Sequence, residues 1–569
     1  MPNKPLSPAL MDRVLKKVAT LSREYPLLPY SVIGGRCDRL NAVGPMVLRD
    51  LMAESGASRA TWQSRIQVTK TQRPLAWAAA LKGQVLDGTQ GEGTPAHLHA
   101  AVTRRFLLTA AQDDTPVHEA FWKSLQTFAR HVRAEIMVGG FTYGKALFTD
   151  HETRAGVFAE AVRPYLRHEN VSLSPDLVFC AKMNTLPTAV RPLSGLETYT
   201  QGRWGVFPHA KVQLVSVPAL NGAHPALLMT TGACTRANYI EKKAGLKAEF
   251  HHVIGATLVE IDPAGRVFCR QINASDDGSF QDLTTFVSGS KVSSGRRVEA
   301  ITWGDIHRSK IDPGVARSAW GLDVKTDTIR PGETMLDELR PRHQFFHDLI
   351  DFEARNHHRK KDHAFHFEML HKGRHLVDGE NRQAARFLRL TAREWCESVV
   401  IASNHNESFP RWLLEADPRQ DPHNALIWFR ANTAIYEAIE RGDESFDVVR
   451  WALERHDADT LQDITFVPRD GSYVICQATG GIECSLHGDQ GPNGSRGSPL
   501  ALTKVATRIN IGHGHQAWIG DGVYAAGLCG LFDQGYNEGP SGWSHTQIVT
   551  YSNGKRSLVT FREGHWRAT

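Results

Sequence analysis

A chain of 569 residues can form two to four domains whose cores are large enough to fold without disulfide support. It carries 66 Lys and Arg against 61 Asp and Glu, a formal net charge of +5, so its charge permits a polyanionic partner without requiring one. No apolar run approaches the roughly 20 residues that span a bilayer, and the first residues lack the apolar core of a signal peptide. The eight cysteines are scattered singly. We therefore expect a cytoplasmic protein with reduced thiols that does not enter a membrane.

Residues 1–140 are predicted to be mainly helical, because residues 8–22 and 116–136 carry apolar residues at helical spacing. Within this region, GPMVLRDLMAESGASRATWQSRIQV (44–68) fits two helices joined by a turn. Such a pair can bind DNA through its second helix, but most helical hairpins serve only as packing elements. Both interpretations stay open.

Residues 141–295 are predicted to form a strand-rich accessory domain. Short β-rich runs such as AKVQLVSVPAL (210–220) and GATLVEID (255–262) are separated by turn sequences such as PAGR (263–266). No pattern of reactive residues stands out in this region, and its role stays open.

Residues 296–569 follow another pattern, in which an apolar strand runs into a polar loop rich in Asp, Asn or His, and a helical stretch follows. This alternation is typical of a layered α/β domain with its functional site on loops at strand ends. The sequence therefore predicts an α/β fold for this third region.

Five of these loops carry side chains that suit a metal ion. They are VEAITWGDIH with Asp305 and His307, HQFFHDLID with Asp348 and Asp351, CESVVIASNHNE with Asn404 and His405, GGIECSLHGD with His487, and NIGHGH with His513 and His515. Asp305 and His307 are two apart on an extended backbone, so they point the same way and can share one cation. Each loop also has a plain alternative, such as a capping pair at 305–307 or acids that suit a helix N-terminus at 348–351.

Glycines flank both histidines of the last loop, at 512 and 514. They leave room for backbone and metal to approach, and two neighbouring imidazoles can serve two adjacent ions. Five such loops in one region favour a metal centre over five coincidences.

In chain order these segments resemble the calcineurin-like metallophosphoesterase superfamily and its SbcD-like nuclease branch. The family pattern of Asp-x-His, Gly-Asp-x-x-Asp, Gly-Asn-His-Asp/Glu, His and Gly-His-x-His is matched as GDIH, HDLID, SNHNE, LHGD and GHGH, over roughly residues 298–520. The resemblance implies a four-layer α/β sandwich for residues 296–569, preceded by the helical N-terminal region and the strand-rich domain.

The resemblance also implies two metal-binding sets that share one ligand. The first set is Asp305, His307, Asp348 and His515, and the second is Asp348, Asn404, His487 and His513. Asp348 would bridge the two ions, and His405 would face the substrate phosphate as the family's catalytic histidine.

Three positions depart from the family pattern. His347 replaces the glycine before the bridging Asp, Ser403 replaces the glycine before Asn404, and the acid after His405 is displaced from 406 to Glu407. That acid orients the catalytic histidine in the family, so the group that supports His405 is left open. Asp351 is expected to act behind the ligands.

Nitrogen and oxygen ligands without thiolates suit Mn²⁺, Mg²⁺, Fe or Zn²⁺, and the family often works with Mn²⁺. Two divalent ions about 3.5–4 Å apart activate a water and clamp the oxygens of an in-line displacement at phosphorus. We expect two divalent ions, Mn²⁺ first, and hydrolysis of a phosphoester with His405 stabilising the phosphoryl or leaving oxygen.

The segment that follows Asp351, residues 353–375, holds six Lys or Arg and six His against three acids. It suits guidance of a DNA backbone to the metals, or it is a solvated helix face. Candidate DNA contacts are Arg308, Lys310, Arg359, Lys360 and Lys361, with Lys555 and Arg556 at the tip of a hairpin predicted over 545–561.

A closer resemblance rests on TTGACTRANYIEKKAGLKAEFHHVIGATLVEID (230–262), TWGDIH and SNHNESFPRWL. These runs look like the pre-early DNA-transfer nucleases of T-five-type siphophages. The resemblance implies a Mn²⁺-dependent DNA nuclease made early by a phage, which acts in the host cytoplasm in host DNA degradation and phage DNA transfer. It also implies a homo-oligomer and a second phage early protein as a partner.

Two other functions stay open. One is a small-molecule phosphatase or phosphodiesterase, which would act on small aryl phosphoesters and show no salt-sensitive affinity for DNA. The other is a DNA-binding host-takeover protein with a structural metal site.

Overall fold

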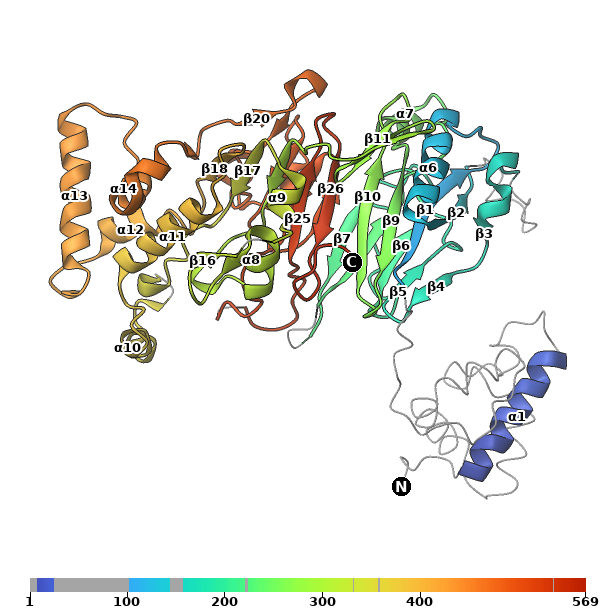
Figure 1. Ribbon diagram of the computed structural model, residues 1–569, viewed down its shortest axis with the longest axis horizontal. Helices are drawn as coiled ribbons and strands as arrows, with labels where there is room; N and C mark the ends of the chain where they lie inside the picture. Colours follow the sequence, from blue (N-terminus) through green and yellow to red (C-terminus); the bar gives the residue numbers. More distant parts are fainter. Residues whose placement is uncertain are drawn as a thin grey trace. The chain divides into compact units, whose positions relative to one another are not determined.

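The computed structural model describes residues 8–24, 102–143, 157–220, 224–330, 332–356, 359–535 and 537–568 (Figure 1). The chain divides into two compact units, Met1–Leu98 and His99–Thr569. In the first unit, α1 (Pro8–Glu24) confirms the helix predicted over 8–22. One face of α1 buries Met11, Val14 and Val18. The predicted helix-turn-helix segment, 44–68, lies outside the described residues.

The second unit begins with a five-stranded sheet in the order β10-β9-β1-β2-β3. Its strands are β1 (Arg104–Gln112), β2 (Ala134–Phe141), β3 (Leu166–Arg167), β9 (Gly255–Ile261) and β10 (Val267–Asn273). Between β1 and β2 runs α6 (Glu119–Val132), whose Phe121, Leu125 and Phe128 form one apolar face. That face packs on Leu107 of β1 and Val138 of β2.

The strands β1 and β2 were not predicted within residues 1–140, whereas α1 and α6 agree with the two predicted helices. β1 is buried along seven consecutive residues, from Phe106 to Gln112, because α6 covers one face of the sheet and other strands cover the opposite face. A strand buried on both faces shows a continuous apolar run without alternation, so local periodicity does not separate it from a helix.

A ten-stranded mixed sheet has the order β20-β21-β22-β24-β23-β7-β8-β6-β5-β4. Its strands are β4 (Val171–Ser174), β5 (Leu177–Phe179), β6 (Trp204–Phe207), β7 (Leu214–Val217), β8 (Ala226–Thr230), β20 (Val474–Ile475), β21 (Ile482–Glu483), β22 (Ile509–Ile511), β23 (Trp518–Gly520) and β24 (Val523–Ala525). The predicted strands within 141–295 are therefore present. The pairing of Ile519 with Leu214 joins strands from both sides of residue 295 in one sheet. The three-part domain division stays a prediction.

The six-stranded sheet that carries most of the site has the order β19-β18-β17-β14-β25-β26. Its strands are β14 (Ala300–Thr302), β17 (His343–Phe346), β18 (Glu397–Ile401), β19 (Thr465–Val467), β25 (Thr546–Thr550) and β26 (Arg556–Thr560). The first four run parallel to one another, and β25 pairs antiparallel with both β14 and β26. The predicted hairpin between β25 and β26 is confirmed, with Gly554 at a φ of +72°.

Alternate residues of the central strands point to opposite faces of this sheet. Ala300, Phe345 and Val399 pack against Ile475 and Ile482 of the ten-stranded sheet. On the other face, Ile301, Phe346 and Val400 pack against helices. The six-stranded sheet thus lies between helices and one end of the ten-stranded sheet, and the predicted α/β class is confirmed.

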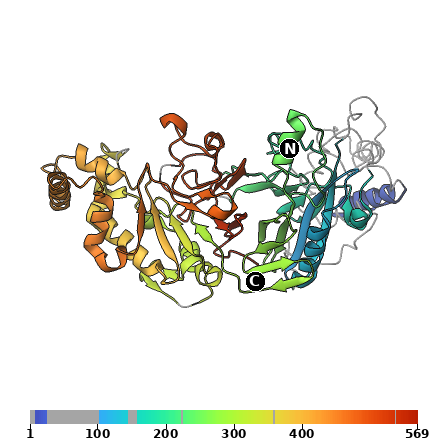
Figure 2. The same cartoon turned by 90° about the horizontal axis from the view of Figure 1, so that it is seen from above.

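Most helices of this part gather at one end of the unit, with α8 and α9 nearer its middle beside β25, whereas the sheet of β1, β2, β9 and β10 lies at the other end (Figures 1 and 2). They are α8 (Pro313–Trp320), α9 (Met335–Leu339), α10 (His363–His371), α11 (Val377–Thr391), α12 (Ser408–Glu415), α13 (Ala425–Glu440) and α14 (Val448–Leu461). Among the described residues, no helix is both long and apolar enough to cross a bilayer.

The smaller elements lie between these. They are α7 (Lys243–Phe250), α15 (Pro499–Leu502), β11 (Phe280–Asp282), β12 (Thr285–Ser288), β13 (Lys291–Ser293), β15 (Leu322–Asp323), β16 (Thr328–Ile329) and the 3₁₀ turns Glu160–Tyr165, Arg308–Lys310, Glu353–Arg355, Gln477–Thr479 and Pro492–Gly494.

Candidate metal centre

Each of the five predicted loops follows a strand, as expected. β14, β17 and β18 lead into the loops of Asp305, Asp348 and Asn404, and β21 and β22 lead into the loops of His487 and His513. The first three strands belong to the six-stranded sheet and the last two to the ten-stranded sheet. The site therefore forms where the ends of strands from two sheets come together.

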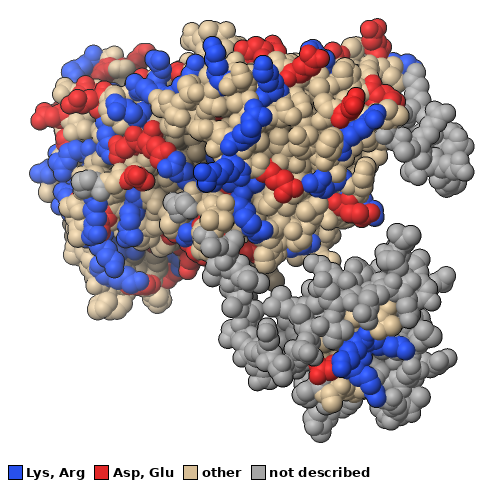
Figure 3. Space-filling view, turned by 45° about the vertical axis from the view of Figure 1, so that its right-hand side comes forward, with Lys and Arg blue, Asp and Glu red and all other residues tan. Residues whose placement is uncertain are grey.

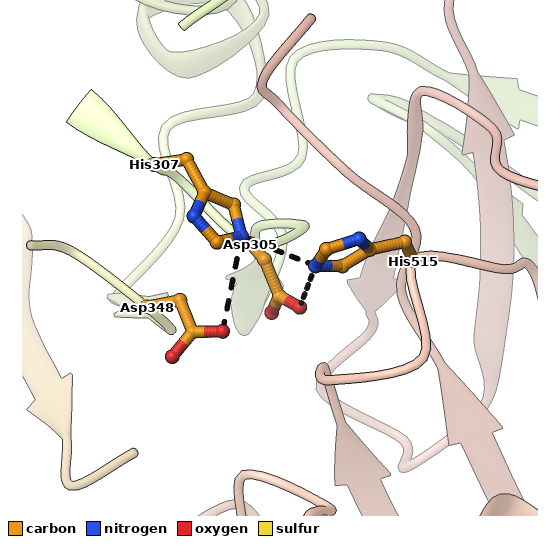
Figure 4. Close-up of side chains that lie close together, drawn as sticks. All are labelled: Asp305, His307, Asp348 and His515. Atoms are coloured by element: carbon orange, nitrogen blue, oxygen red, sulfur yellow. Dashed lines mark hydrogen bonds and ion pairs between the residues drawn. The ribbon is translucent and has the colours of Figure 1, made fainter. Parts of the chain in front are cut away.

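Four buried residues bring their ligand atoms within 4.8 Å of one another: Asp305, His307, Asp348 and His515 (Figure 4). His515 Nε2 lies 3.0 Å from Asp305 Oδ2 and 3.1 Å from His307 Nε2. His307 Nε2 lies 3.9 Å from Asp348 Oδ2. These residues form the closed half-site, which is the first metal-binding set that the sequence predicted.

The closed half-site fits a divalent cation. Metal-to-ligand bonds of about 2.0–2.2 Å place neighbouring ligand atoms roughly 3–3.5 Å apart, close to the separations between His515 and its two neighbours. Two imidazoles and two carboxylates form a mixed nitrogen and oxygen shell without a thiolate, which suits Mn²⁺, Fe or Zn²⁺.

The carboxylates are also in the protonation state that a ligand needs. Burial alone would raise the pKa values of Asp305 and Asp348, but the surrounding imidazoles outweigh it and lower both pKa values. Both groups are therefore ionised at neutral pH, as metal binding requires.

The backbone is strained at four of the residues that were predicted to bind metal. His307, Asp348, His513 and His515 have φ values of +44°, +44°, +69° and +55°, in the left-handed region that non-glycine residues rarely adopt. Such strain persists only where the surroundings hold it, and it is typical of functional sites.

Close packing against Asp305 explains why one of the residues that flank the two histidines, Gly512, is a glycine. A Cβ at this position would lie 2.3 Å from Asp305 Oδ1, and the His513 amide donates to the same oxygen at 3.1 Å. A Cβ at Gly514 would meet no described atom within 4 Å. The close approach of backbone to ligand is therefore confirmed at Gly512 and not at Gly514.

A second group of candidate ligands also lies near Asp348, and we call it the open half-site: Asn404, His487 and His513. His487 Nε2 lies 2.9 Å from Asn404 Oδ1 and 3.3 Å from Asp348 Oδ2. The rings of His513 and His487 are 5.1 Å apart. Because Asp348 Oδ2 lies near ring nitrogens of both half-sites, its carboxylate is placed to bridge them.

Carboxylates control the charge of His487. Burial alone would lower the pKa of His487, but Asp348 and Asp305 outweigh it and raise the pKa to about 9. A cation at this position would have to displace that proton, because a ligating imidazole is neutral.

His405 lies between these ligands and a cavity of about 200 Å³ that it lines with Asn404 and Arg411. Its Nδ1 lies 3.1 Å from the Asp351 carbonyl oxygen and 3.7 Å from Asp351 Oδ1. Asp351 Oδ1 also lies 3.2 Å from His307 Nδ1. Asp351 therefore orients His405, which identifies the support that the sequence left open, and it also contacts one ligand from behind.

Glu407, the acid displaced by one position after His405, forms an ion pair with an arginine, and Asn406 occupies the position before it. Asn406 accepts a hydrogen bond from the Ile350 amide at 3.0 Å. Glu407 pairs with Arg469, whose Nη2 donates to Glu407 Oε2 at 2.8 Å. The same guanidinium donates to both oxygens of Asp489, at 2.6 and 2.7 Å. Arg469 thus ties the His405 loop to the His487 loop.

Arg469 is a site residue that was not predicted from the sequence, although its position along the chain carries a signal. Arg469 follows β19, the parallel neighbour of β18, and so obeys the same rule of a polar loop after a strand. His347, which replaces the family's glycine, is buried and places Nδ1 3.4 Å from His487 Nδ1.

The five candidate DNA contacts lie in different surroundings. Arg308 and Lys310 are largely buried and pair with Asp327 at 2.7 Å and Glu353 at 3.0 Å. Arg359 pairs with Asp362 at 3.2 Å, whereas Lys360 and Lys361 are exposed. Basic and acidic side chains are interspersed over the face shown in Figure 3. Their assignment to DNA stays a prediction.

The hairpin tip differs from its expected role. Arg556 is buried and donates to the Ile509 carbonyl at 2.8 Å and to Asn510 Oδ1 at 2.9 Å. Its guanidinium therefore supports the strand before the His513 loop.

Protein A1 of Escherichia phage T5 is 38% identical to this chain over 479 residues, which span 82% of this chain and 83% of that protein. This chain belongs to the family of phage T5 Protein A1. No protein-family model matches the chain, and no solved structure matches it. The resemblance to T-five-type phage proteins is therefore confirmed at the level of the family, while membership of the metallophosphoesterase superfamily stays a prediction.

Proposed function

We propose that this member of the Protein A1 family is a metal-dependent DNA nuclease with the architecture and two-ion site of the calcineurin-like metallophosphoesterases. One observation carries the proposal: Asp348 lies between two groups of ligands, with His405 beside them at a cavity. A carboxylate shared by two nitrogen and oxygen sets suits a pair of divalent cations and hydrolysis at phosphorus.

The chain's own residues have separate tasks in this mechanism. The closed half-site would hold one ion and the open half-site the other, with Asp348 common to both. When bound, the pair supplies a Lewis acid for the phosphoryl oxygens and an activated water, with Mn²⁺ as the first choice of metal. His405 reaches the cavity with one ring edge while Asp351 contacts its Nδ1. The ring is therefore oriented to donate from Nε2 to a phosphoryl or leaving oxygen.

DNA is proposed as the substrate because exposed cations lie beside this cavity. Arg411 lines it, and Lys360, from the segment that follows Asp351, lines a larger cavity that shares Arg411 with it. A phosphate backbone is drawn to such groups, and its binding weakens as salt rises. Action early in phage infection, in the host cytoplasm, belongs to the same proposal.

The test compares the wild type with Asp348→Asn on linear and circular double-stranded DNA, single-stranded DNA and a small aryl phosphodiester. Each reaction contains Mn²⁺, Mg²⁺ or EDTA. We expect metal-dependent loss of DNA that falls more than about 100-fold in Asp348→Asn, because the amide cannot bridge two cations. Asp443→Asn changes an exposed acid in the α13–α14 loop and is the matched control.

Three outcomes contradict the nuclease. Turnover of the aryl diester alone indicates a small-molecule phosphodiesterase. DNA binding without turnover by the wild type indicates a host-takeover protein with a structural metal. Equal DNA cleavage by the wild type and Asp348→Asn excludes this site as its source.

A further inference from the structure

A second, larger cavity adjoins the site. It has a volume of about 630 Å³, and it shares Asn356, Ser408 and Arg411 with the 200 Å³ cavity at His405. We call it the side cavity. Ligand pockets typically span about 300–1,000 Å³, so the side cavity is large enough for a nucleotide.

Aromatic and apolar groups line the side cavity from two helices. Phe367 and Leu370 of α10 are 69% and 45% exposed, and Trp412 of α12 is largely buried. Met369 is the one buried residue of α10. An exposed Phe and Leu on a lightly packed helix, in a cavity that an indole also lines, make a surface on which a flat ring can stack.

The side cavity is lined by three cations and three acids, and Arg419 outside it pairs with one of the acids. Its acids have basic partners, at separations of 3.8, 2.8 and 2.5 Å: Glu415 with Lys360, Asp417 with Arg419, and Asp421 with Arg355. Arg411 is exposed, and no ion pair or side-chain hydrogen bond joins it to another residue in the part of the chain that the structure describes. This guanidinium lies at the junction of the two cavities.

We propose that the side cavity holds an unpaired nucleotide next to the scissile phosphate of DNA. Its base stacks against Phe367, and Arg411 binds the phosphate that joins it to the reacting one. The inference rests on the proposed nuclease function and adds its preferred substrate. A base inside a duplex cannot enter a recess of this kind without leaving its stack, so single strands and frayed ends are cut faster than intact duplex.

The test uses Phe367→Ala and Arg411→Ala, with Phe429→Ala as the matched control. Phe429 is an exposed Phe of α13 outside both cavities. The substrates are a single-stranded oligonucleotide, the same strand with an abasic residue on either side of the cut, the duplex, and a small aryl phosphodiester with Mn²⁺.

Removal of a stacking partner should raise KM for the intact single strand about tenfold in Phe367→Ala, relative to the aryl diester. For the wild type, KM for the abasic strand should exceed KM for the intact strand by a similar factor. For Phe367→Ala, the two KM values should be nearly equal. Arg411→Ala should reduce the slope of log KM against log salt concentration by the amount expected for the loss of about one phosphate contact. Phe429→Ala should match the wild type.

Two results overturn this inference while the nuclease stands. In one, the wild type cuts DNA but treats intact and abasic strands alike. In the other, Phe367→Ala and Arg411→Ala keep the wild-type KM for the single strand. A wild type that hydrolyses only the aryl diester overturns both this inference and the proposed function. Because Phe367 and Arg411 are exposed, thermal unfolding of each variant should match the wild type.

Discussion

The closed and open half-sites share Asp348 but differ in their access to solvent. In the closed half-site Asp305 and His307 are fully buried, and His515 packs its ring 4.4 Å from that of Trp543. In the open half-site Asn404 and His513 are partly exposed, and Asn404 lines the 200 Å³ cavity with His405.

This difference separates holding a metal from exposing it to substrate. A cation in the closed half-site would have protein groups around it, whereas one in the open half-site would keep room for water and a phosphoryl oxygen. The two sets should therefore respond differently when a ligand is removed.

The largest effect is expected from the two histidines of one loop. His515→Ala should lower turnover more than about 100-fold and remove one bound Mn²⁺ per chain, because a buried ligand has no ready replacement. His513→Ala should lower turnover about tenfold and recover at high Mn²⁺, because water can take the vacated position. Metal content after gel filtration and kcat across a Mn²⁺ titration measure both effects.

Equal rescue of the two variants by Mn²⁺ would contradict the distinction between the half-sites. The wild type treated with EDTA is the reference for the metal-free protein. Saturating Mn²⁺ at about 100 times its Kd should stabilise the wild type by about 2.7 kcal/mol, and His515→Ala should lose most of that gain.

An effect of intermediate size is expected from the two glycines of the same loop. Gly512→Ala places a Cβ 2.3 Å from Asp305 Oδ1, so the loop must shift away from the closed half-site. We expect a loss of activity of roughly 10- to 100-fold, with about 1–3 kcal/mol lower stability from the overpacking. Gly514→Ala meets open space and should stay within about threefold of the wild type. Activity and thermal unfolding of the pair decide whether proximity to Asp305 sets the effect.

Much of the site was predictable because its signal is local. Each ligand-bearing loop follows directly after a short apolar strand, and the chemistry of Asp, Asn and His is visible in the residue names. β14 before Asp305 and β22 before His513 are examples. The order of these loops along the chain is the basis of the resemblance to the calcineurin-like metallophosphoesterases.

What the sequence did not reveal depends on contacts between distant segments. The pairing of Ile519 with Leu214 joins residues 305 positions apart, and no local pattern encodes it. The burial of β1 on both faces removed the alternation that would have marked a strand. The support of His405 by Asp351 depends on the fold of the loop after β17, and the side cavity depends on how α10 and α12 lie beside it.

The smallest effect is expected from Arg469, and it tests whether the open half-site depends on this residue to hold its two loops together. We call Arg469 with its two acidic partners the brace. Arg469 binds Glu407 and Asp489, which follow His405 and His487 by two residues each. Arg469→Ala should leave the two acids without their shared partner and let the loops separate, which lowers turnover about tenfold and weakens the second Mn²⁺ more than the first.

Arg469→Lys should recover little of that loss, because an ammonium group cannot make paired contacts with two carboxylates at once. Arg441→Ala, at an exposed pair with Glu437 outside both cavities, is the control and should behave as the wild type. If Arg469→Ala instead lowered the affinity for both ions equally, the brace would stabilise both half-sites through Asp348. The closed half-site would then depend on the open one for its geometry.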